Sequence, residues 1–297
     1  MRNLMQPTKN KVLLAVSGGP DSIFLFHWAL NIYGPKNIVV ATINYKTRQE
    51  SDLEVEYVRS LCESKNVTFE FKTFIYEKTY GNFESWAREK RYEFFNEIYL
   101  KYDCKTLLTG HHKDDFIETA LMQEESGRKP LFYGIKEHNF LLGMQIYRPF
   151  VLKYWKSEIY QNLHNCNIKY FEDSSNLNTN FTRNKIRKNL SNFSNGEKEL
   201  IFARFQSLNL KLQDLSLKIN KTFSFWRESK FSQDKFRDLE HKDYLIFKYI
   251  IEFYSNIKLS SQKINSIVKW VLSENRTSKF KLKDDVYLIK KRGLLVA

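Results

Sequence analysis

Six consecutive residues have the composition of a loop that holds a phosphate group: Ser17, Gly18, Gly19, Pro20, Asp21 and Ser22. The apolar run 12–16 before them is typical of a buried parallel strand, and the longer apolar run 23–30 after them predicts a buried helix. The two glycines allow a sharp turn and a close approach to a ligand. Asp21 or Ser22 can cap the helix, whose N–H groups and dipole favour an anion.

This loop differs from two common nucleotide loops. A Walker loop ends in Gly-Lys-Ser/Thr and the dinucleotide fingerprint has a third glycine, and the segment 17–22 has neither. A plain Gly-Gly turn with a capping residue is the alternative for an isolated Ser-Gly-Gly. The whole hexapeptide, however, resembles the loop of the PP-loop ATP pyrophosphatases. That resemblance implies cleavage of ATP between the α and β phosphates and adenylation of an acceptor.

The segment 109–119 carries five further groups that can do chemistry: His111, His112, Asp114, Asp115 and Glu118. If a helix begins here, Asp115 and Glu118 share one face, because they are three residues apart. Mg²⁺ bound to ATP requires carboxylate oxygens, so Asp21 and Asp115 are predicted to hold Mg²⁺, and either histidine can donate to a phosphate oxygen. A transition-metal site is the alternative for the histidines and carboxylates, and Glu118 is alternatively a surface or capping residue.

Two more charged segments flank these groups. One stripe of a helix predicted over 83–102 carries Glu84, Arg88 and Arg91, for which a weak solvent-exposed ladder is the alternative. The second segment is a basic helix with Arg183 and Arg187 one turn apart, accompanied by Asn184, Lys185 and Lys188. Such a face can lie along phosphates, with an ordinary solvated face as the alternative.

Strands and helices alternate in the first half of the chain. Strands are predicted at 37–45, 67–74 and 105–109, with helices at 51–65 and 83–102. This order predicts an α/β fold with a doubly wound parallel sheet, whose ligand site lies at the carboxyl ends of the strands. We therefore expect 17–22, the region after Tyr45 and 110–118 to converge.

The second half is predicted to be mainly helical. Apolar residues recur at steps of three and four from Ile201 to Ile219, which predicts a long amphipathic helix, with a coiled-coil homodimer as the alternative. Helices at 242–256 and 261–274 and a hairpin at 279–297 follow. We expect a catalytic domain at 1–200 and a mainly helical domain at 201–297, with the boundary between 190 and 215.

Composition points to a polyanionic partner. The 297 residues carry a formal net charge of +14, and 181–230 alone holds 11 Lys and Arg against 4 Asp and Glu. No signal peptide or membrane span is recognisable, so we expect a cytoplasmic protein. The three cysteines form no CxxC pair, which favours structural, reduced thiols.

Six motifs together resemble the tRNA(Ile)-lysidine synthases over roughly 12–190. They are the PP-loop hexapeptide, the Glu-x-x-x-Arg-x-x-Arg-Tyr helix from Glu84, the segment 110–119, Arg148-Pro149, Tyr-x-Glu-Asp-Ser-Ser-Asn from Tyr170, and Thr-Arg-Asn-x-Ile-Arg from Thr182. The resemblance implies a ligase that adenylates the C2 oxygen of the wobble cytidine of tRNA(Ile) with a CAU anticodon. The side-chain amine of free L-lysine then displaces AMP. The product, lysidine, changes the codon read from AUG to AUA and the amino-acid identity from Met to Ile.

The resemblance also assigns roles to residues, as expectations. Candidates for receiving lysine or substrate are Glu84, Arg88, Arg91, Asp114, Glu118, Glu172 and Asp173, although the last two alternatively cap a turn. Candidates for binding tRNA are Arg148, Arg183, Asn184, Lys185, Arg187 and Lys188, and the resemblance implies that the helical domain at 201–297 binds tRNA as well. The chain departs from the family pattern after Tyr45, where Arg48 alone aligns, and at 126–130, where a glycine-rich segment is reduced. A tRNA thiolation enzyme and a non-catalytic RNA-binding protein are the alternative functions.

Overall fold

The computed structural model describes residues 10–47, 51–77, 82–126, 129–172, 181–254, 257 and 259–296. The chain divides into two compact units. Unit 1 consists of Met1–Gly127 and Tyr133–Gln206, and unit 2 of Arg128–Phe132 and Ser207–Ala297. The helix α7 (Asn195–Glu228) contributes residues to both units.

Unit 1 is built on a sheet that has six strands within the described residues. Their spatial order is β3 (Thr68–Thr73), β2 (Ile38–Asn44), β1 (Val12–Ala15), β4 (Thr106–Leu108), β6 (Met144–Tyr147) and β5 (His138–Leu141). The pairs from β3 to β6 are parallel, and β5 runs antiparallel to β6. The carboxyl ends of β1 and β4 are therefore neighbours, which places the loops that follow them side by side.

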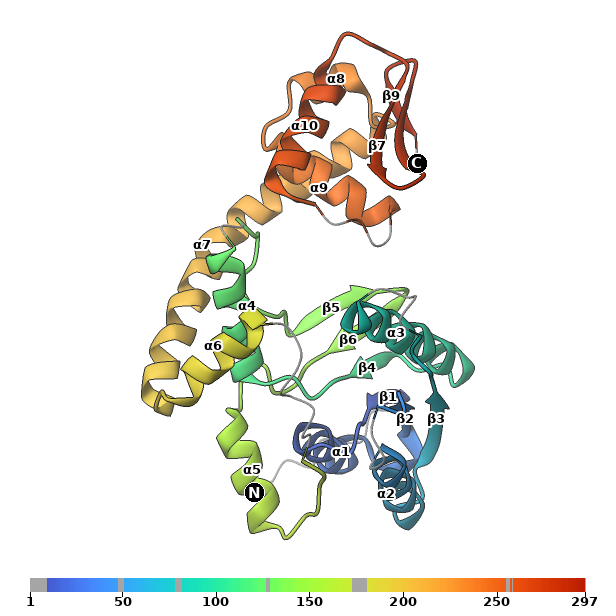
Figure 1. The fold of residues 1–297 in the computed structure, drawn as a ribbon, viewed down its shortest axis with the longest axis vertical. Coiled ribbons are helices and arrows are strands. Elements are labelled where there is room, and N and C mark those ends of the chain that lie inside the picture. The colour runs from blue at the N-terminus through green and yellow to red at the C-terminus, as the bar shows by residue number, and fades with distance from the viewer. Residues whose placement is uncertain are drawn as a thin grey trace. The chain divides into compact units, whose positions relative to one another are not determined.

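Alternating apolar side chains on these strands bury both faces of the sheet. Leu14, Val40 and Leu108 face a core completed by α1 (Pro20–Tyr33), α2 (Ser51–Ser64) and α5 (Lys156–Asn165). Leu13 and Val39 face the opposite core, against α3 (Phe83–Lys101). Figure 1 shows α1 and α2 on one side of these strands and α3 on the other. A short 3-10 helix, Pro35–Asn37, joins α1 to β2.

Three helices lie beyond the carboxyl end of β4. They are α4 (Lys113–Glu125), α6 (Phe181–Ser191) and the first turns of α7. The ring of Phe116 on α4 packs 5.0 Å from the ring of Phe202 on α7, centroid to centroid. Gly134 lies against the same Phe116 ring so closely that an added Cβ atom would be 2.7 Å from it. This packing fixes α4, which carries several of the predicted site residues.

Unit 2 has its own core. The second part of α7 contributes Phe223 and Trp226, which pack against α8 (Gln233–Arg237), α9 (Lys242–Phe253) and α10 (Ser261–Leu272). A small antiparallel sheet completes the unit, in the order β7 (Ser278–Lys283), β8 (Val286–Lys291) and β9 (Leu294–Val296). Lys290 on β8 is fully buried, and its Nζ donates to the carbonyl of Trp270 at 2.9 Å near the end of α10. The same carbonyl also accepts from the N–H of the C-cap residue Ser273 at 3.3 Å and from its Oγ at 2.8 Å, so several donors converge on the end of α10.

The predicted fold class is confirmed, with two differences. The strands β5 and β6 were not predicted, and the C-terminal hairpin has β9 as a third strand. The predicted long helix is confirmed and is longer than expected, since α7 begins at Asn195 and ends at Glu228. None of the described helices is both long enough and apolar enough to cross a bilayer.

Candidate active site

The loop 17–22 joins β1 to α1 and is closed by its own side chains. Ser22 Oγ donates to the Gly19 carbonyl at 2.9 Å and accepts from the Ser17 N–H at 3.1 Å. Gly18 has a φ of +90°, which a residue with a Cβ atom rarely adopts. The N-cap residue of α1 is Gly19 and no side chain caps it, so the expected capping by Asp21 or Ser22 is not observed. Ser22 instead holds the loop shape, and the helix end stays available to an anion.

The segment after β4 packs directly against this loop. A Cβ atom added to Gly110 would lie 2.7 Å from the backbone oxygen of Asp21, so only glycine fits here without a shift. This close approach brings the residues that follow Gly110 next to Asp21. The loops after β1 and β4 thus converge at the carboxyl ends of these two strands, in line with the expectation from strand order.

His112 lies among three carboxylates. Its Nε2 atom is 3.5 Å from Asp21 Oδ2 and 3.4 Å from Asp115 Oδ2, and its Nδ1 atom is 3.5 Å from Asp114 Oδ2. Burial lowers the pKa of His112, but the negative charges of Asp115, Asp114 and Asp21 outweigh burial and hold it well above the usual value. Burial raises the pKa of Asp115, and the charge of His112 outweighs it, so that this pKa is lowered. The cluster therefore contains a protonated imidazole beside the ionised carboxylates of Asp114 and Asp115.

His111 has the opposite character. Its Nδ1 atom is 2.8 Å from Thr109 Oγ1 at the end of β4. Burial lowers the pKa of His111 to about 4, assisted by the charges of Arg148 and His112. At neutral pH this ring is uncharged, so it can act on a phosphate or a base as a neutral donor or acceptor.

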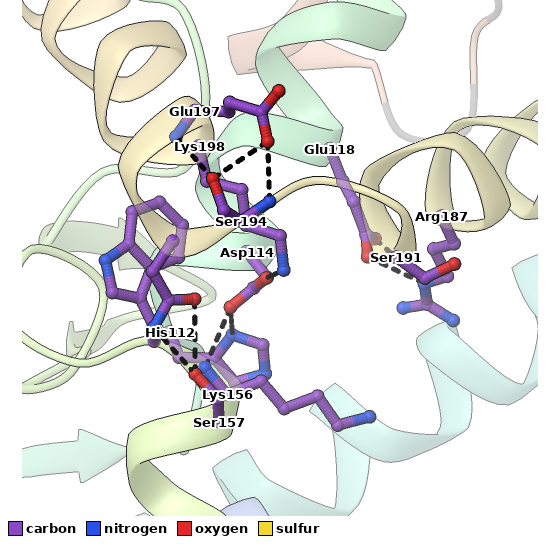
Figure 2. A network of polar contacts seen from close by, with 12 residues as sticks. His112, Asp114, Glu118, Lys156, Ser157, Arg187, Ser191, Ser194, Glu197 and Lys198 are labelled. Atoms are coloured by element: carbon purple, nitrogen blue, oxygen red, sulfur yellow. Dashed lines mark hydrogen bonds and ion pairs between the residues drawn. The ribbon is translucent and has the colours of Figure 1, made fainter.

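Asp114 connects three helices (Figure 2). Its Oδ2 atom accepts from the backbone N–H of Lys156 at 2.8 Å, and its Oδ1 atom accepts from Lys198 Nζ at 2.8 Å. Burial raises the pKa of Asp114, but its contacts with His112, Lys156 and Lys198 outweigh burial and lower it strongly. The sequence placed Asp114 among the candidates for receiving lysine. In the structure both of its oxygens already bind groups of the protein.

Glu118 is the second buried carboxylate of α4. Both of its carboxylate oxygens accept from Arg187 Nε at 2.9 Å, an ion pair visible in Figure 2. Arg183 Nε lies 3.7 Å from Glu118 Oε2, and Arg183 Nη1 lies 3.6 Å from Glu84 Oε1. The two arginines were expected on a basic face beside Lys185 and Lys188. They turn instead toward the carboxylates, while both lysines are exposed.

The remaining predicted residues are distributed as follows. Arg148 is buried and its Nη1 donates to the Lys136 carbonyl at 2.8 Å, so it presents no free surface to a tRNA backbone, contrary to expectation. Arg88 and Arg91 are exposed and lie over the rings of Tyr92 and Tyr45, respectively. Asn184 is half-buried and Glu172 is exposed. Arg48 and Asp173 lie outside the described residues.

The chain is similar to known proteins over most of its length. Residues 1–193 match the family model described as the PP-loop domain. A tRNA(Ile)-lysidine synthase from Mycoplasmopsis pulmonis is 40% identical over 95% of this chain and 98% of that protein. A tRNA(Ile)-lysidine synthase from Mesomycoplasma hyopneumoniae is 33% identical over 96% of this chain and 95% of that protein. The chain belongs to the tRNA(Ile)-lysidine synthase family.

A solved structure is similar in fold to this member of the lysidine synthase family. The U34-tRNA thiolase NcsA from Methanococcus maripaludis, solved with its 4Fe-4S cluster, has a TM-score of 0.57 and 17% identity, and the match covers 70% of this chain and 74% of that chain. At this identity the likeness shows the fold alone.

Burial raises the pKa of the Cys62 thiol to about 12 and that of Cys104 to about 11, so these two thiols stay protonated.

The site residues present in this lysidine synthase family member fit a hard cation at the PP-loop. The Oδ1 atom of Asp21 is buried and has no hydrogen-bond partner among the described residues. Asp115 presents a second carboxylate to the same His112 nitrogen. Oxygen ligands of this kind suit Mg²⁺. Within the described ranges no three His, Cys, Asp or Glu side chains form a metal-binding group, so the alternative of a transition-metal site finds no ligand set there.

Two residues at the start of α7 that contact the segment around the site were missed by the sequence analysis, and the first of them is a functional candidate. Lys198 binds Asp114, and Glu199 accepts from Lys113 Nζ at 2.9 Å and from Trp155 Nε1 at 3.2 Å. Lys198 is 84 residues from Asp114 in the sequence, and it lies beyond the residues that match the PP-loop family model. No local spacing rule connects such distant residues, so a signal for this pair exists only in three dimensions.

Proposed function

We propose that this protein joins free L-lysine to C2 of the wobble cytidine of tRNA(Ile) with a CAU anticodon, with conversion of ATP to AMP and pyrophosphate. The observation that carries the proposal is similarity over 95% of the chain to a protein named tRNA(Ile)-lysidine synthase. The PP-loop, with Asp21 and Asp115 beside it, is consistent with the first step of this reaction. The expected place of the reaction is the cytoplasm, where its substrates occur.

The reaction has two steps in this proposal. The C2 oxygen of cytidine attacks the α-phosphorus of ATP, the bond to the bridging oxygen of the β-phosphate breaks, and pyrophosphate leaves with that electron pair. The side-chain amine of lysine, having lost a proton, then attacks C2, and the C2–oxygen bond breaks to release AMP. The loop 17–22 and the N-terminus of α1 would bind the phosphates, since both favour anions. Positioning of the reactants and stabilisation of charge supply most of the acceleration.

The residues around the loop would serve these two steps. Asp21 and Asp115 are the proposed ligands of Mg²⁺, which would place positive charge beside the phosphates. The charged His112 would orient the two carboxylates, and neutral His111 would donate to a phosphate oxygen. Glu118 and Glu84 are proposed to receive a positively charged group of lysine. Lys185 and Lys188, together with unit 2, would bind the tRNA backbone.

Incorporation of labelled lysine tests the proposal directly. Transcripts of tRNA(Ile) with a CAU anticodon are incubated with the protein and radiolabelled lysine, with and without ATP. The control is a tRNA(Met) transcript with the same anticodon. ATP-dependent label in tRNA(Ile) and none in tRNA(Met) is expected. Pyrophosphate release without label would retain PP-loop chemistry and reject lysine as the nucleophile, and neither signal would favour a non-catalytic RNA-binding protein.

A homodimer is a separate proposal. The exposed leucines Leu210 and Leu217 on α7 are compatible with self-association through this helix. Sedimentation equilibrium of the full chain measures the molecular mass, and a monomer at micromolar concentration would reject the dimer.

A further inference from the structure

The carboxylate of Glu118 is buried, while the two arginines that neutralise it are partly exposed. The Glu118 side chain is 8% exposed, compared with 31% for Arg183 and 36% for Arg187. Solvent, and any molecule that approaches through solvent, therefore reaches the guanidinium groups before it reaches the carboxylate.

This ion pair belongs to the candidate active site. Burial, and after it the charge of Asp115, raises the pKa of Glu118 in spite of the charges of Arg187 and Arg183. The pKa of Arg187 is raised against the effect of burial, mainly by Glu118 and also by Asp115 and Asp21. Glu118 follows Asp115 by three residues on α4, so the ion pair lies on the helix face from which Asp115 contacts His112 beside the phosphate-binding loop. A phosphate group bound there would attract the Arg187 guanidinium.

The arginines are suited to exchange one anion for another. A guanidinium presents a planar set of donors that matches phosphate as well as carboxylate. Arg183 Nε is buried and has no hydrogen-bond partner among the described residues, although it lies 3.7 Å from Glu118 Oε2. It therefore has an unused donor for an incoming anion. The terminal phosphate of ATP carries more charge and more non-bridging oxygens than a carboxylate, and a backbone phosphodiester equals the carboxylate in both.

Glu118 cannot lose its counter-ions without a replacement. A buried carboxylate without a partner is strongly unfavourable, so the arginines leave only if another cation takes their place. An ammonium group of lysine is compact and supplies three donors. Glu84, which contacts Arg183 in the free protein, would be released at the same moment.

We propose that Arg183 and Arg187 pair with Glu118 until a phosphate group of a substrate binds the two arginines instead. Glu118 and Glu84 then bind an ammonium group of free lysine. This inference rests on the proposed function, and it adds that lysine binding is coupled to binding of a phosphate-bearing substrate. The phosphate comes from the tRNA backbone or from ATP. By linkage, lysine tightens binding of that substrate by the same factor.

The test is the dissociation constant of lysine, measured by titration calorimetry on the unmodified full chain in three arms. The arms are the protein alone, the protein with a non-hydrolysable ATP analogue, and the protein with the tRNA(Ile) transcript but no ATP. We expect lysine to bind about 5–150-fold more tightly in at least one of the two phosphate arms, the usual range of coupling between sites. The arm that shows the change identifies the source of the phosphate. Equal dissociation constants in all three arms would overturn the coupling.

A substitution separates this role from a merely structural one. Glu118→Gln should weaken lysine binding in the coupled arm, while the phosphate-bearing substrate binds as tightly as before or more tightly, because the arginines lose their competitor. Weaker binding of both ligands would mean that Glu118 only holds α6 in place, and would overturn the proposal.

The matched control is Glu124→Gln on the same helix. Glu124 pairs with Arg204 at 2.8 and 2.9 Å, but this pair is exposed. The control should retain the coupling of the unmodified protein.

Lysidine formation is measured in parallel on the unmodified protein. Lysidine formed with no coupling overturns this inference alone, whereas no lysidine overturns the proposed function and the coupling with it.

Discussion

His111 and His112 are adjacent in the sequence, but their surroundings give them opposite charge. Desolvation and the nearby charge of Arg148 make the His111 ring, which contacts Thr109, neutral, while His112 faces three carboxylates and is protonated. Neither state follows from residue type, since both rings share one ordinary pKa. The close approach of Gly110 to Asp21 creates the difference, because it places the second imidazole among the carboxylates. One pair of neighbours thereby provides both a neutral and a charged imidazole.

At this scale we predict that Asp21→Asn and Asp115→Asn each lower the rate of adenylation by about 100-fold or more, the usual cost of removing charge stabilisation at a phosphate or oxyanion site. An amide retains the size of the carboxylate but cannot hold Mg²⁺ or balance the charge of His112. Pyrophosphate release in the presence of tRNA and lysine measures the rate, and filter binding measures affinity for tRNA. The affinity for tRNA should change less than about threefold, since in the proposed function neither carboxylate contacts the phosphate backbone of the tRNA.

The matched control for this prediction is Asp103→Asn. Asp103 is exposed, pairs with Lys105 and has a φ of +51°, which asparagine tolerates. The control should retain the full rate. If Asp21→Asn unfolded the protein, as judged by its melting temperature, the role assigned to this carboxylate would be structural instead.

At the scale of elements, the sequence predicts most of the sheet but not the contacts between distant segments. The apolar runs at β1, β2 and β4 are continuous because these strands are buried on both faces. The edge strand β5 lacks that signal, since its residues are mostly exposed and its turn to β6 is a Leu142-Gly143 pair with no turn signature. Arg183 and Arg187 were correctly placed on a helix. Their direction depends on Glu118, 69 residues away from Arg187, and no periodicity reveals it.

The pair Lys198–Asp114 gives a prediction about how α7 supports the site. Both side chains are largely buried, with 15% and 11% exposed, and Asp114 in turn faces His112. We expect Lys198→Met to leave Asp114 Oδ1 unpaired and to lower kcat for pyrophosphate release about tenfold, equivalent to about 1.4 kcal/mol, with KM for ATP unchanged. Lys198→Arg should restore most of the rate, because the guanidinium can donate to the same oxygen.

The neighbouring pair provides the control for Lys198. Lys113→Met removes the contact with Glu199 on the same turn of α7 but does not touch Asp114. Its kcat should stay close to that of the unmodified protein. An equal loss in both variants would show that α7 acts by general stability, and would contradict positioning of His112 through Asp114.

At the scale of the whole molecule, positive charge is distributed over both units. In unit 2, the exposed residues Lys279 and Lys281 lie on β7 beside Ile289 and Tyr287 of β8. The opposite face carries Leu282 and Leu288, which are buried in the core of unit 2. The exposed face thus combines cations with an aromatic ring, a combination suited to RNA because it offers charge for phosphates and a surface for a base or ribose.

We therefore predict that the double substitution Lys279→Gln and Lys281→Gln weakens binding of tRNA and lowers the slope of log affinity against log salt by roughly one unit for each lost phosphate contact. Because phosphate contacts carry no sequence information, tRNA(Ile) and tRNA(Met) should lose affinity equally.

The control removes the same charge at Lys36 and Lys105. These exposed residues lie just before β2 and β4, at the ends of the strands opposite the candidate active site. The control should retain the slope of the unmodified protein. Equal loss of slope in both double variants would mean that net charge alone drives the association. An unchanged slope for the β7 variant would place the tRNA on another surface of the protein.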